Sequence, residues 1–203
     1  MKNVILTGTE EDMIFELNRA GYSIKGYFGI KKKHYLKFLG TITKIENYIK
    51  LLPKTKICIA MGPTQRRKKL LKKYKKNILT YVSNKSLVSP TAKVLNGSFI
   101  QSYCYLGNNC KIGECCKINV SSNIHHDSEV GSFTDMAPNS TVLGNSKIGK
   151  KCYLGAGSII REKILVTDNV MTGINSAVVK DITKPGTYVG VPAKKIKKFY
   201  IRP

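Results

Sequence analysis

A six-residue period runs through the second half of this chain and constrains its fold more than any other feature. Every sixth residue from Val88 to Val178 is large and apolar, with Thr172 as the exception among sixteen positions. The position four residues later is small at twelve successive steps: Ala92, Ser98, Cys104, Cys110, Cys116, Ser122, Ser128, Thr134, Ser140, Ser146, Cys152 and Ser158. Such hexapeptides are typical of a parallel β-helix, in which each apolar residue stacks on its equivalent one coil below. Three hexapeptides make a triangular coil of about 18 residues, so the repeat predicts about five coils.

The six cysteines have a structural explanation in this repeat. Cys104, Cys110, Cys116 and Cys152 occupy the small position, where a thiol is a compact apolar filler. A zinc site near Cys115-Cys116 would need ligands at metal-site spacing, and the chain has no pair of C-x-x-C motifs. We therefore expect free thiols and no bound metal.

Composition changes near residues 84–89, which predicts two domains, 1–85 and 86–203. The first has alternating strand and helix patterns, typical of a small Rossmann-like parallel sheet covered by helices. Its predicted elements are strands at 4–6, 24–28, 57–61 and 78–82 and helices at 14–20, 43–52 and 63–76, the first helix being closed by Gly21. Ligands of such sheets bind beyond the carboxyl ends of the strands. The turns there are Thr7-Gly8-Thr9, Phe28-Gly29-Ile30 and Met61-Gly62-Pro63, where glycine allows a phosphate to approach the backbone.

The net charge of the chain is strongly positive. It has 35 Lys and Arg against 12 Asp and Glu, a formal charge of +23, and residues 1–85 carry +15 of it. Such an excess first suggests nucleic acid or an anionic membrane surface. The basic stretch 63–76 has no aromatic stripe and the chain has no nucleic-acid-binding motif, so nucleic-acid binding stays only as an alternative. No apolar run approaches the ~18 residues of a membrane span, and we expect a soluble, cytoplasmic protein.

One hexapeptide departs from the others in a way that suggests chemistry. It reads Ile124-His125-His126-Asp127-Ser128-Glu129 and holds two of the three histidines of the chain. A histidine can act as a general base near neutral pH, and an adjacent carboxylate that accepts its other N–H fixes its tautomer. The alternative is a pair of solvated surface histidines.

These features together resemble a family of bacterial sugar acetyltransferases. The hexapeptides, the His-Asp pair, Gly144, the turn Gly155-Ala156-Gly157 and the closing segment 188–194 are similar to sialic acid O-acetyltransferases and to the UDP-4-amino-sugar N-acetyltransferases of bacillosamine synthesis. The resemblance covers essentially the whole chain. It implies a small Rossmann-like domain followed by a left-handed parallel β-helix, with acetyl-CoA bound between neighbouring β-helices of a homotrimer.

The resemblance also implies roles for individual residues. His126 matches the catalytic base and Asp127 the carboxylate that orients it, while His125 is the less suitable base. The N–H of Gly144 would hold the developing oxyanion. Asp135, Ala156, Gly173 and Ile174 match positions near the pantetheine of acetyl-CoA. Contacts to a nucleotide sugar would come from Gly8, Thr9, Gly29, Ile30 and Gly62.

The implied reaction is acetyl transfer to the 4-amino group of a nucleotide-linked 4-amino-4,6-dideoxy sugar, and the alternative acceptor is a hydroxyl of a sialic-acid-like sugar. Three departures from the family concern the acceptor. The first loop is Thr7-Gly8-Thr9-Glu10-Glu11-Asp12 instead of a Gly-rich loop followed by His. Gly29 to Lys33 replaces an acidic pair, and Asp135 replaces a second histidine, where its carboxylate could hold a substrate ammonium.

Overall fold

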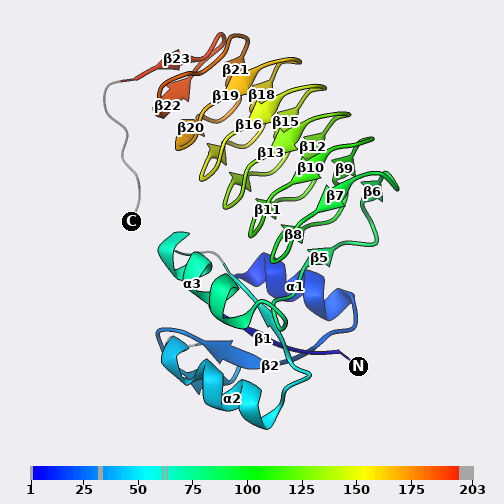
Figure 1. Ribbon diagram of the computed structural model, residues 1–203, viewed down its shortest axis with the longest axis vertical. Helices are drawn as coiled ribbons and strands as arrows, with labels where there is room; N and C mark the ends of the chain where they lie inside the picture. The colour runs from blue at the N-terminus through cyan, green and yellow to red at the C-terminus, as the bar shows by residue number, and fades with distance from the viewer. Residues whose placement is uncertain (1, 32–33, 61, 63, 197–203) are drawn as a thin grey trace. The chain divides into compact units, whose positions relative to one another are not determined.

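The computed structural model describes residues 2–31, 34–60, 62 and 64–196, and the chain forms two compact units, Met1–Tyr81 and Val82–Pro203 (Figure 1). The first unit is an α/β domain. Its elements are β1 (Asn3–Leu6), α1 (Glu11–Arg19), β2 (Ser23–Phe28), β3 (Phe38–Gly40), the 3-10 helix η1 (Ile42–Lys44), α2 (Ile45–Leu51), β4 (Lys56–Cys58) and α3 (Thr64–Tyr74). The strands pair in parallel in the order β3-β2-β1-β4. The predicted parallel sheet with helices is confirmed.

Helix α1 shows how local sequence defines an element of this unit. It buries Met13, Ile14 and Leu17, which recur at helical spacing. The helix ends at Arg19 and is followed by the C-cap Ala20 and by Gly21, whose φ of +75° is readily adopted by glycine. The N–H of Tyr22 donates to the carbonyl of Leu17, closing the helix in a Schellman arrangement.

Two strands are shorter than expected from the sequence, and Met61, the last residue of the first, lies outside the described residues. The strand expected over 57–61 ends at Cys58, because the N–H of Ala60 donates to Thr7 Oγ1 (3.1 Å) instead of continuing the sheet. In the segment expected as a strand over 78–82, Ile78 forms only an isolated bridge with Ile57, and the regular strand is β5 (Tyr81–Val82). The short strand β3 has no counterpart among the predictions.

The second unit is a parallel β-helix built from short strands. They are β6 (Leu87–Val88), β7 (Lys93–Val94), β8 (Phe99–Ile100), β9 (Tyr105–Leu106), β10 (Lys111–Ile112), β11 (Lys117–Ile118), β12 (Asn123–Ile124), β13 (Glu129–Val130), β14 (Asp135–Met136), β15 (Thr141–Val142), β16 (Lys147–Ile148), β17 (Tyr153–Leu154), β18 (Ile159–Ile160), β19 (Leu165–Val166), β20 (Val170–Thr172) and β21 (Ala177–Val178). The antiparallel pair β22 (Gly186–Val189) and β23 (Lys194–Lys195) follows. The predicted β-helix is confirmed.

Successive strands pass through three sheets in turn. The six-stranded sheet runs β21-β18-β15-β12-β9-β6, the five-stranded sheet β19-β16-β13-β10-β7, and the eight-stranded sheet β23-β22-β20-β17-β14-β11-β8-β5. Paired residues are 18 positions apart, as in Asn123 opposite Thr141 and Ile124 opposite Val142. A residue and its equivalent one coil later therefore occupy the same place on the β-helix.

The interior of the β-helix is an unbroken apolar column with small polar side chains beside it. From Ile100 to Val178 the residues at the six-residue period are at most 4% exposed. The small residues donate to carbonyls of the next coil, as Ser128 Oγ does to Leu143 (2.8 Å) and Cys116 Sγ to Gly131 (3.3 Å). The thiols thus hydrogen bond weakly as well as filling space. Buried polar groups of this kind are stable only when they find partners, and the stacked coils supply them.

All six cysteines are buried thiols, and none of them forms a disulfide. Burial raises the pKa of the Cys110 thiol to about 11, so this group stays protonated at neutral pH. Among the residues described, no group of three or more His, Cys, Asp or Glu is arranged to hold a metal ion. In the same part of the chain, no helix is long and apolar enough to cross a membrane.

Candidate functional site

The His126-Asp127 pair lies at the turn that follows strand β12. Asp127 has a φ of +57°, and an equivalent left-handed residue recurs every six positions along the β-helix. Asn and Asp tolerate this conformation better than most residues, so the repeat alone explains part of the choice of Asp here. The left-handed turn also positions Asp127 so that its Oδ2 lies 3.0 Å from Nδ1 of His126.

A third residue extends this pair. Asn109 occupies the equivalent position one coil below Asp127, and its Nδ2 donates to Asp127 Oδ1 (3.1 Å). The two carboxylate oxygens thus have separate partners. The hydrogen bond from His126, and then that from Asn109, lowers the pKa of Asp127. In the tautomer with the proton on Nδ1, His126 would donate to an ionised Asp127 and Nε2 would be the unprotonated nitrogen, as a general base requires.

Gly144 occupies the position equivalent to His126 one coil above. A Cβ at Gly144 would lie 2.6 Å from Nε2 and 2.7 Å from Cε1 of His126, so only glycine leaves room for the ring in this orientation. The Gly144 carbonyl accepts the N–H of Lys163. The Gly144 N–H has no hydrogen-bond acceptor within the described residues, and Gly144 itself is buried. The ring of His126 therefore packs closely against Gly144.

The exposure of the two histidines differs. The side chains of His126 and Asp127 are 58% and 46% exposed, which gives a ligand access to Nε2. His125 is partly buried, and its ring packs edge-to-face against Tyr105 with 5.4 Å between centroids. Packing of this kind restrains His125 and favours a structural role.

The residues expected near pantetheine gather elsewhere on the β-helix. Asp135 lies in β14 of the eight-stranded sheet, is 7% exposed, and stands opposite Lys117 and Tyr153. Ala156 follows β17 of the same sheet, and its carbonyl accepts the N–H of Asn175 (2.8 Å). Gly173 and Ile174 follow β20 of that sheet, one coil beyond Gly155-Ala156, and Ile174 is 76% exposed. His126 and Gly144 follow strands of the six-stranded sheet, so the predicted set divides between two corners of one β-helix.

In the first unit, the expected nucleotide-sugar residues share one edge of the sheet. Gly8, Gly29 and Gly62 follow β1, β2 and β4 and have φ values of +148°, +154° and +156°, which few other residues adopt. Thr9 is partly buried and Ile30 is 74% exposed. Because β1, β2 and β4 are parallel neighbours, their turns emerge side by side. Lys32 and Lys33 lie outside the described residues.

Sequence reasoning missed Asn109. Its signal was present in the chain, because a residue 18 positions before Asp127 lies directly beneath it in the coil. Gly144, which was predicted, lies one coil after His126 in the same way.

Solved structures with the same fold come from several bacteria. The acetyltransferase domain of PglB from Neisseria gonorrhoeae FA1090 has a TM-score of 0.87 and 20% identity, covering 97% of this chain and 100% of that one. PerB from Caulobacter crescentus, in complex with CoA and GDP-perosamine, has a TM-score of 0.87 and 20% identity, covering 97% of this chain and 98% of PerB. WeeI from Acinetobacter baumannii AYE has a TM-score of 0.75 and 21% identity, with coverage of 97% and 100%.

Sequence comparison also finds relatives that match about a third of the chain. UDP-3-O-acylglucosamine N-acyltransferase from Bordetella avium (strain 197N) is 31% identical over 68 residues, which are 34% of this chain. The match spans about a fifth of that relative, 19% of its length. A family model described as the GMPPB C-terminal domain matches residues 82–198, which is more than half of the chain. By this match, together with a β-helix over the same residues, the chain belongs to the GMPPB C-terminal domain family.

Proposed function

We propose that this protein is an acetyl-CoA-dependent N-acetyltransferase that acts on the amino group of a nucleotide-linked amino sugar. The observation that carries the proposal is the chain Asn109–Asp127–His126 facing Gly144. It places a histidine that is paired with a carboxylate beside a backbone N–H that has no acceptor among the described residues. The fold supports the same reaction, since the PglB domain has been solved with acetyl coenzyme A and PerB with CoA and GDP-perosamine.

In the proposed reaction, the sugar amine attacks the thioester carbonyl of acetyl-CoA. His126 Nε2 takes a proton from the amine as the C–N bond forms, and ionised Asp127 stabilises the resulting imidazolium. The Gly144 N–H donates to the oxyanion of the tetrahedral intermediate. The C–S bond then breaks, and the CoA sulfur takes the proton from His126. The products are the acetamido sugar and free CoA, and no metal enters the reaction.

The division of the predicted residues between two corners suggests how acetyl-CoA binds. A corner carrying His126 and Gly144 on one β-helix would face the Asp135, Ala156, Gly173 and Ile174 region of a neighbouring copy. A groove between two copies provides a concave site of the kind that small ligands prefer. We therefore propose a homotrimer with one such groove at each interface.

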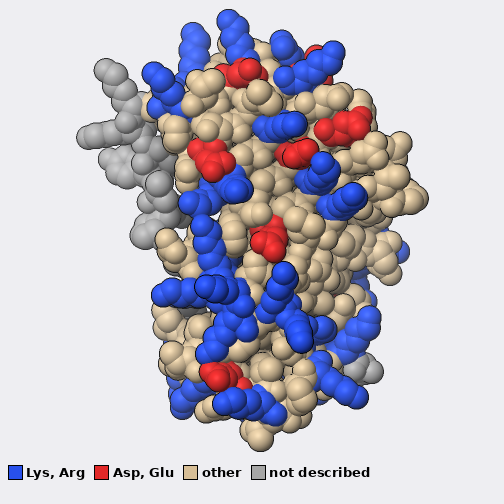
Figure 2. Space-filling model, viewed as in Figure 1, with Lys and Arg blue, Asp and Glu red and all other residues tan. Residues whose placement is uncertain are grey.

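The acceptor is assigned to the turns of the first unit. Gly8, Thr9, Gly29, Ile30 and Gly62 would contact a nucleotide-linked sugar, of which we favour a 4-amino-4,6-dideoxy sugar. Both substrates are polyanions, and the positive charge of the chain would attract them. Figure 2 shows abundant Lys and Arg on the displayed face, with Asp and Glu scattered among them.

Transfer assays test the proposal directly. Release of CoA thiol would be followed with acetyl-CoA and a panel of UDP-, GDP- and dTDP-linked amino sugars, with sialic acids as hydroxyl acceptors. Replacing His126 with Ala should lower kcat by about 10²- to 10⁴-fold. His125→Ala is the matched control and should retain most of the activity. A His126→Ala enzyme with unchanged turnover contradicts the mechanism, whereas transfer only to sialic acids corrects the acceptor. Salt-sensitive binding of DNA or RNA without transfer would instead support the nucleic-acid alternative.

A further inference from the structure

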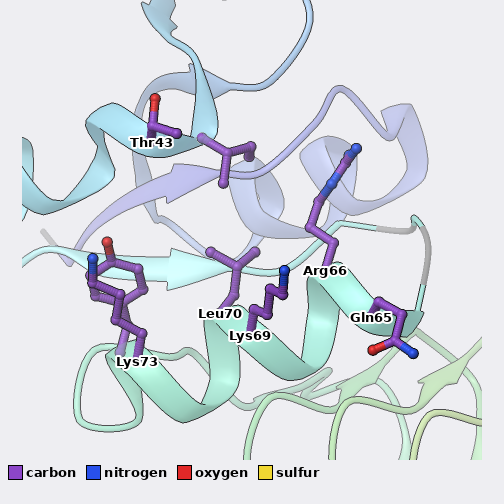
Figure 3. Close-up of a pocket in the computed structure, with 8 residues that line it drawn as sticks. Thr43, Gln65, Arg66, Lys69, Leu70 and Lys73 are labelled. Atoms are coloured by element: carbon purple, nitrogen blue, oxygen red, sulfur yellow. The ribbon is translucent and has the colours of Figure 1, made fainter.

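Positive charge in the first unit is concentrated on α2, α3 and the turns that follow them. Residues 47–77 hold eleven Lys and Arg and no Asp or Glu. Three of these basic residues, Arg66, Lys69 and Lys73, line a cavity of about 460 Å³ between η1 and α3 (Figure 3). Another group lies outside that cavity, in the turns after α2 and α3. The position of this second group separates it from the proposed acceptor site.

The turns after α2 and α3 lie at the edge of the sheet where β4 begins. Residues 52–55 lead directly into β4. Asn77 comes just before Ile78, which bridges Ile57 of β4 in parallel. The glycine turns, in contrast, follow the ends of β1, β2 and β4. The proposed acceptor site and these two turns are thus at opposite ends of the strands.

Hydrogen bonds join the two turns to each other. Asn77 Nδ2 donates to the carbonyls of Pro53 (2.9 Å) and Thr55 (3.1 Å). Lys56 Nζ donates to the carbonyl of Lys76 (3.0 Å). These bonds restrain the backbone of both turns, so their outward side chains belong to one continuous surface.

This surface is both apolar and basic. Leu51 is 80% exposed and its neighbour Leu52 is 46% exposed. The lysines in or beside the two turns are also exposed. We call the six residues together the amino-edge surface: Lys50, Leu51, Leu52, Lys54, Lys75 and Lys76. A partner that fits it offers negative charge together with an apolar phase.

The ends of the helices explain only part of this pattern. A cation at a helix C-terminus interacts favourably with the helix dipole, which accounts for Lys50 in the last turn of α2. Single exposed apolar residues are common, but the dipole gives no reason for two adjacent exposed leucines. Nucleic acid offers phosphates without an apolar phase. Apolar side chains flanked by lysines are typical of segments that bind at the interface of an anionic bilayer.

We propose that the amino-edge surface binds the surface of an anionic lipid bilayer. Leu51 and Leu52 enter the boundary between headgroups and acyl chains, and the lysines lie among the lipid phosphates. The contact is reversible, because two leucines bury far less apolar surface than a membrane-spanning helix does. The glycine turns lie at the other end of the strands and stay open to soluble ligands. The inference goes beyond the proposed function and does not rest on it.

Binding is measured on the full chain by co-sedimentation with vesicles. The probes are vesicles of phosphatidylcholine alone and vesicles of phosphatidylcholine and phosphatidylglycerol in equal parts. The protein should bind the anionic vesicles and leave the neutral ones in solution. Lys54→Gln should weaken this binding by about fivefold, the contribution of one lysine near an anionic surface. Leu51→Ser should weaken it by roughly tenfold, because an apolar side chain no longer enters the interface.

Two matched controls make the same kinds of change elsewhere in the first unit. Lys31→Gln removes one exposed lysine beside the Gly29 turn, at the opposite end of the strands. Phe15→Ser removes an exposed aromatic side chain of α1, which is 64% exposed. Both controls should bind the anionic vesicles nearly as the unchanged protein does. Circular dichroism and melting temperature establish that each variant is folded.

The outcomes that would overturn the inference are distinct. Equal weakening by Lys54→Gln and Lys31→Gln would indicate attraction by net charge alone. Unchanged binding of Leu51→Ser would show that the leucines do not enter the bilayer. Absence of vesicle binding would reject the bilayer as the partner, and polyglutamate binding that depends on Lys54 would then assign the surface to an acidic protein. Acetyl transfer to a soluble acceptor should be unchanged in Lys54→Gln and Leu51→Ser, so this inference and the proposed function can fail separately.

Discussion

Gly144→Ala should abolish most catalysis without unfolding the protein. The new Cβ would lie 2.6 Å from His126 Nε2, far inside van der Waals contact, so one group must move. The imidazole is 58% exposed and is the end of a flexible side chain, so it can swing outward at little cost in stability. The backbone at Gly144 does not have a positive φ, so alanine brings no conformational strain there. The expected loss in kcat is that of a displaced general base, about 10²- to 10⁴-fold, or about 3–5 kcal/mol of transition-state stabilisation.

The matched control for this variant is Gly131→Ala. Its Cβ would lie 2.5 Å from the backbone carbon of Gly149 one coil above, which cannot swing away. This variant should lower the free energy of unfolding by about 1–3 kcal/mol, as overpacking does. Kinetics and thermal melts on both variants therefore separate a local effect on the base from a distortion of the coil.

A double-mutant cycle provides the decisive test. If Gly144→Ala acts by displacing His126, it should have little further effect in the His126→Ala background. Losses that multiply would mean that Gly144 acts independently of the histidine, for example through its N–H alone. Wild-type turnover of Gly144→Ala would refute the placement of the base beside Gly144.

Three further predictions concern neighbouring features. Asn109→Ala removes a hydrogen bond that lowers the pKa of Asp127, so this pKa should rise toward its ordinary value, as measured by NMR titration of the carboxyl carbon. The carboxylate's stabilising contribution is present above its ordinary pKa and is lost as pH falls through the lowered value. An unchanged titration of Asp127 in Asn109→Ala would contradict the role of this hydrogen bond. Ile118→Ala leaves a cavity at a completely buried position and should lower the free energy of unfolding by about 2–5 kcal/mol, as measured by urea titration. A decrease below about 1 kcal/mol would contradict a continuous core. Burial raises the pKa of Cys110 to about 11, so this thiol should resist alkylation at pH 8 in the folded protein and react after denaturation. Mass spectrometry measures the labelling, and rapid labelling of Cys110 in the native chain would be inconsistent with its burial.

The repeat could be predicted from the sequence because each position of the hexapeptide requires one property of its side chain, either apolar character or small size. Ile124 and Val142 must be apolar to fill the interior, and Ser128 must be small to fit beside them. The His126-Asp127 pair could be recognised because the other hexapeptides follow a common pattern and this one departs from it. The first unit was harder, because short strands such as β3 depend on pairing with a neighbour more than on their own composition.

The contacts that sequence reasoning did not predict join residues distant along the chain. Strand β4 ends before Ala60, whose N–H donates to Thr7 Oγ1, and no sequence pattern near residue 60 predicts this hydrogen bond. The cavity beside Lys69 likewise requires η1 to pack against α3, which depends on tertiary structure. Asn109 differs from these, because the coil length of 18 residues alone identifies Asp127 as its neighbour in the next coil.

Because paired residues lie 18 positions apart, the number of residues between two positions decides whether they share a corner of the β-helix. An insertion of six residues between His126 and Gly144 would leave every interior position apolar, yet it would move Gly144 to the turn of the next sheet and away from the histidine. An insertion of 18 residues before Asn109 or after Gly144 would add a whole coil and leave these residues stacked at the same corner. The β-helix can therefore grow or shrink by whole coils outside this segment while its chemistry keeps its orientation, whereas one hexapeptide added between His126 and Gly144 would preserve the fold and separate the two.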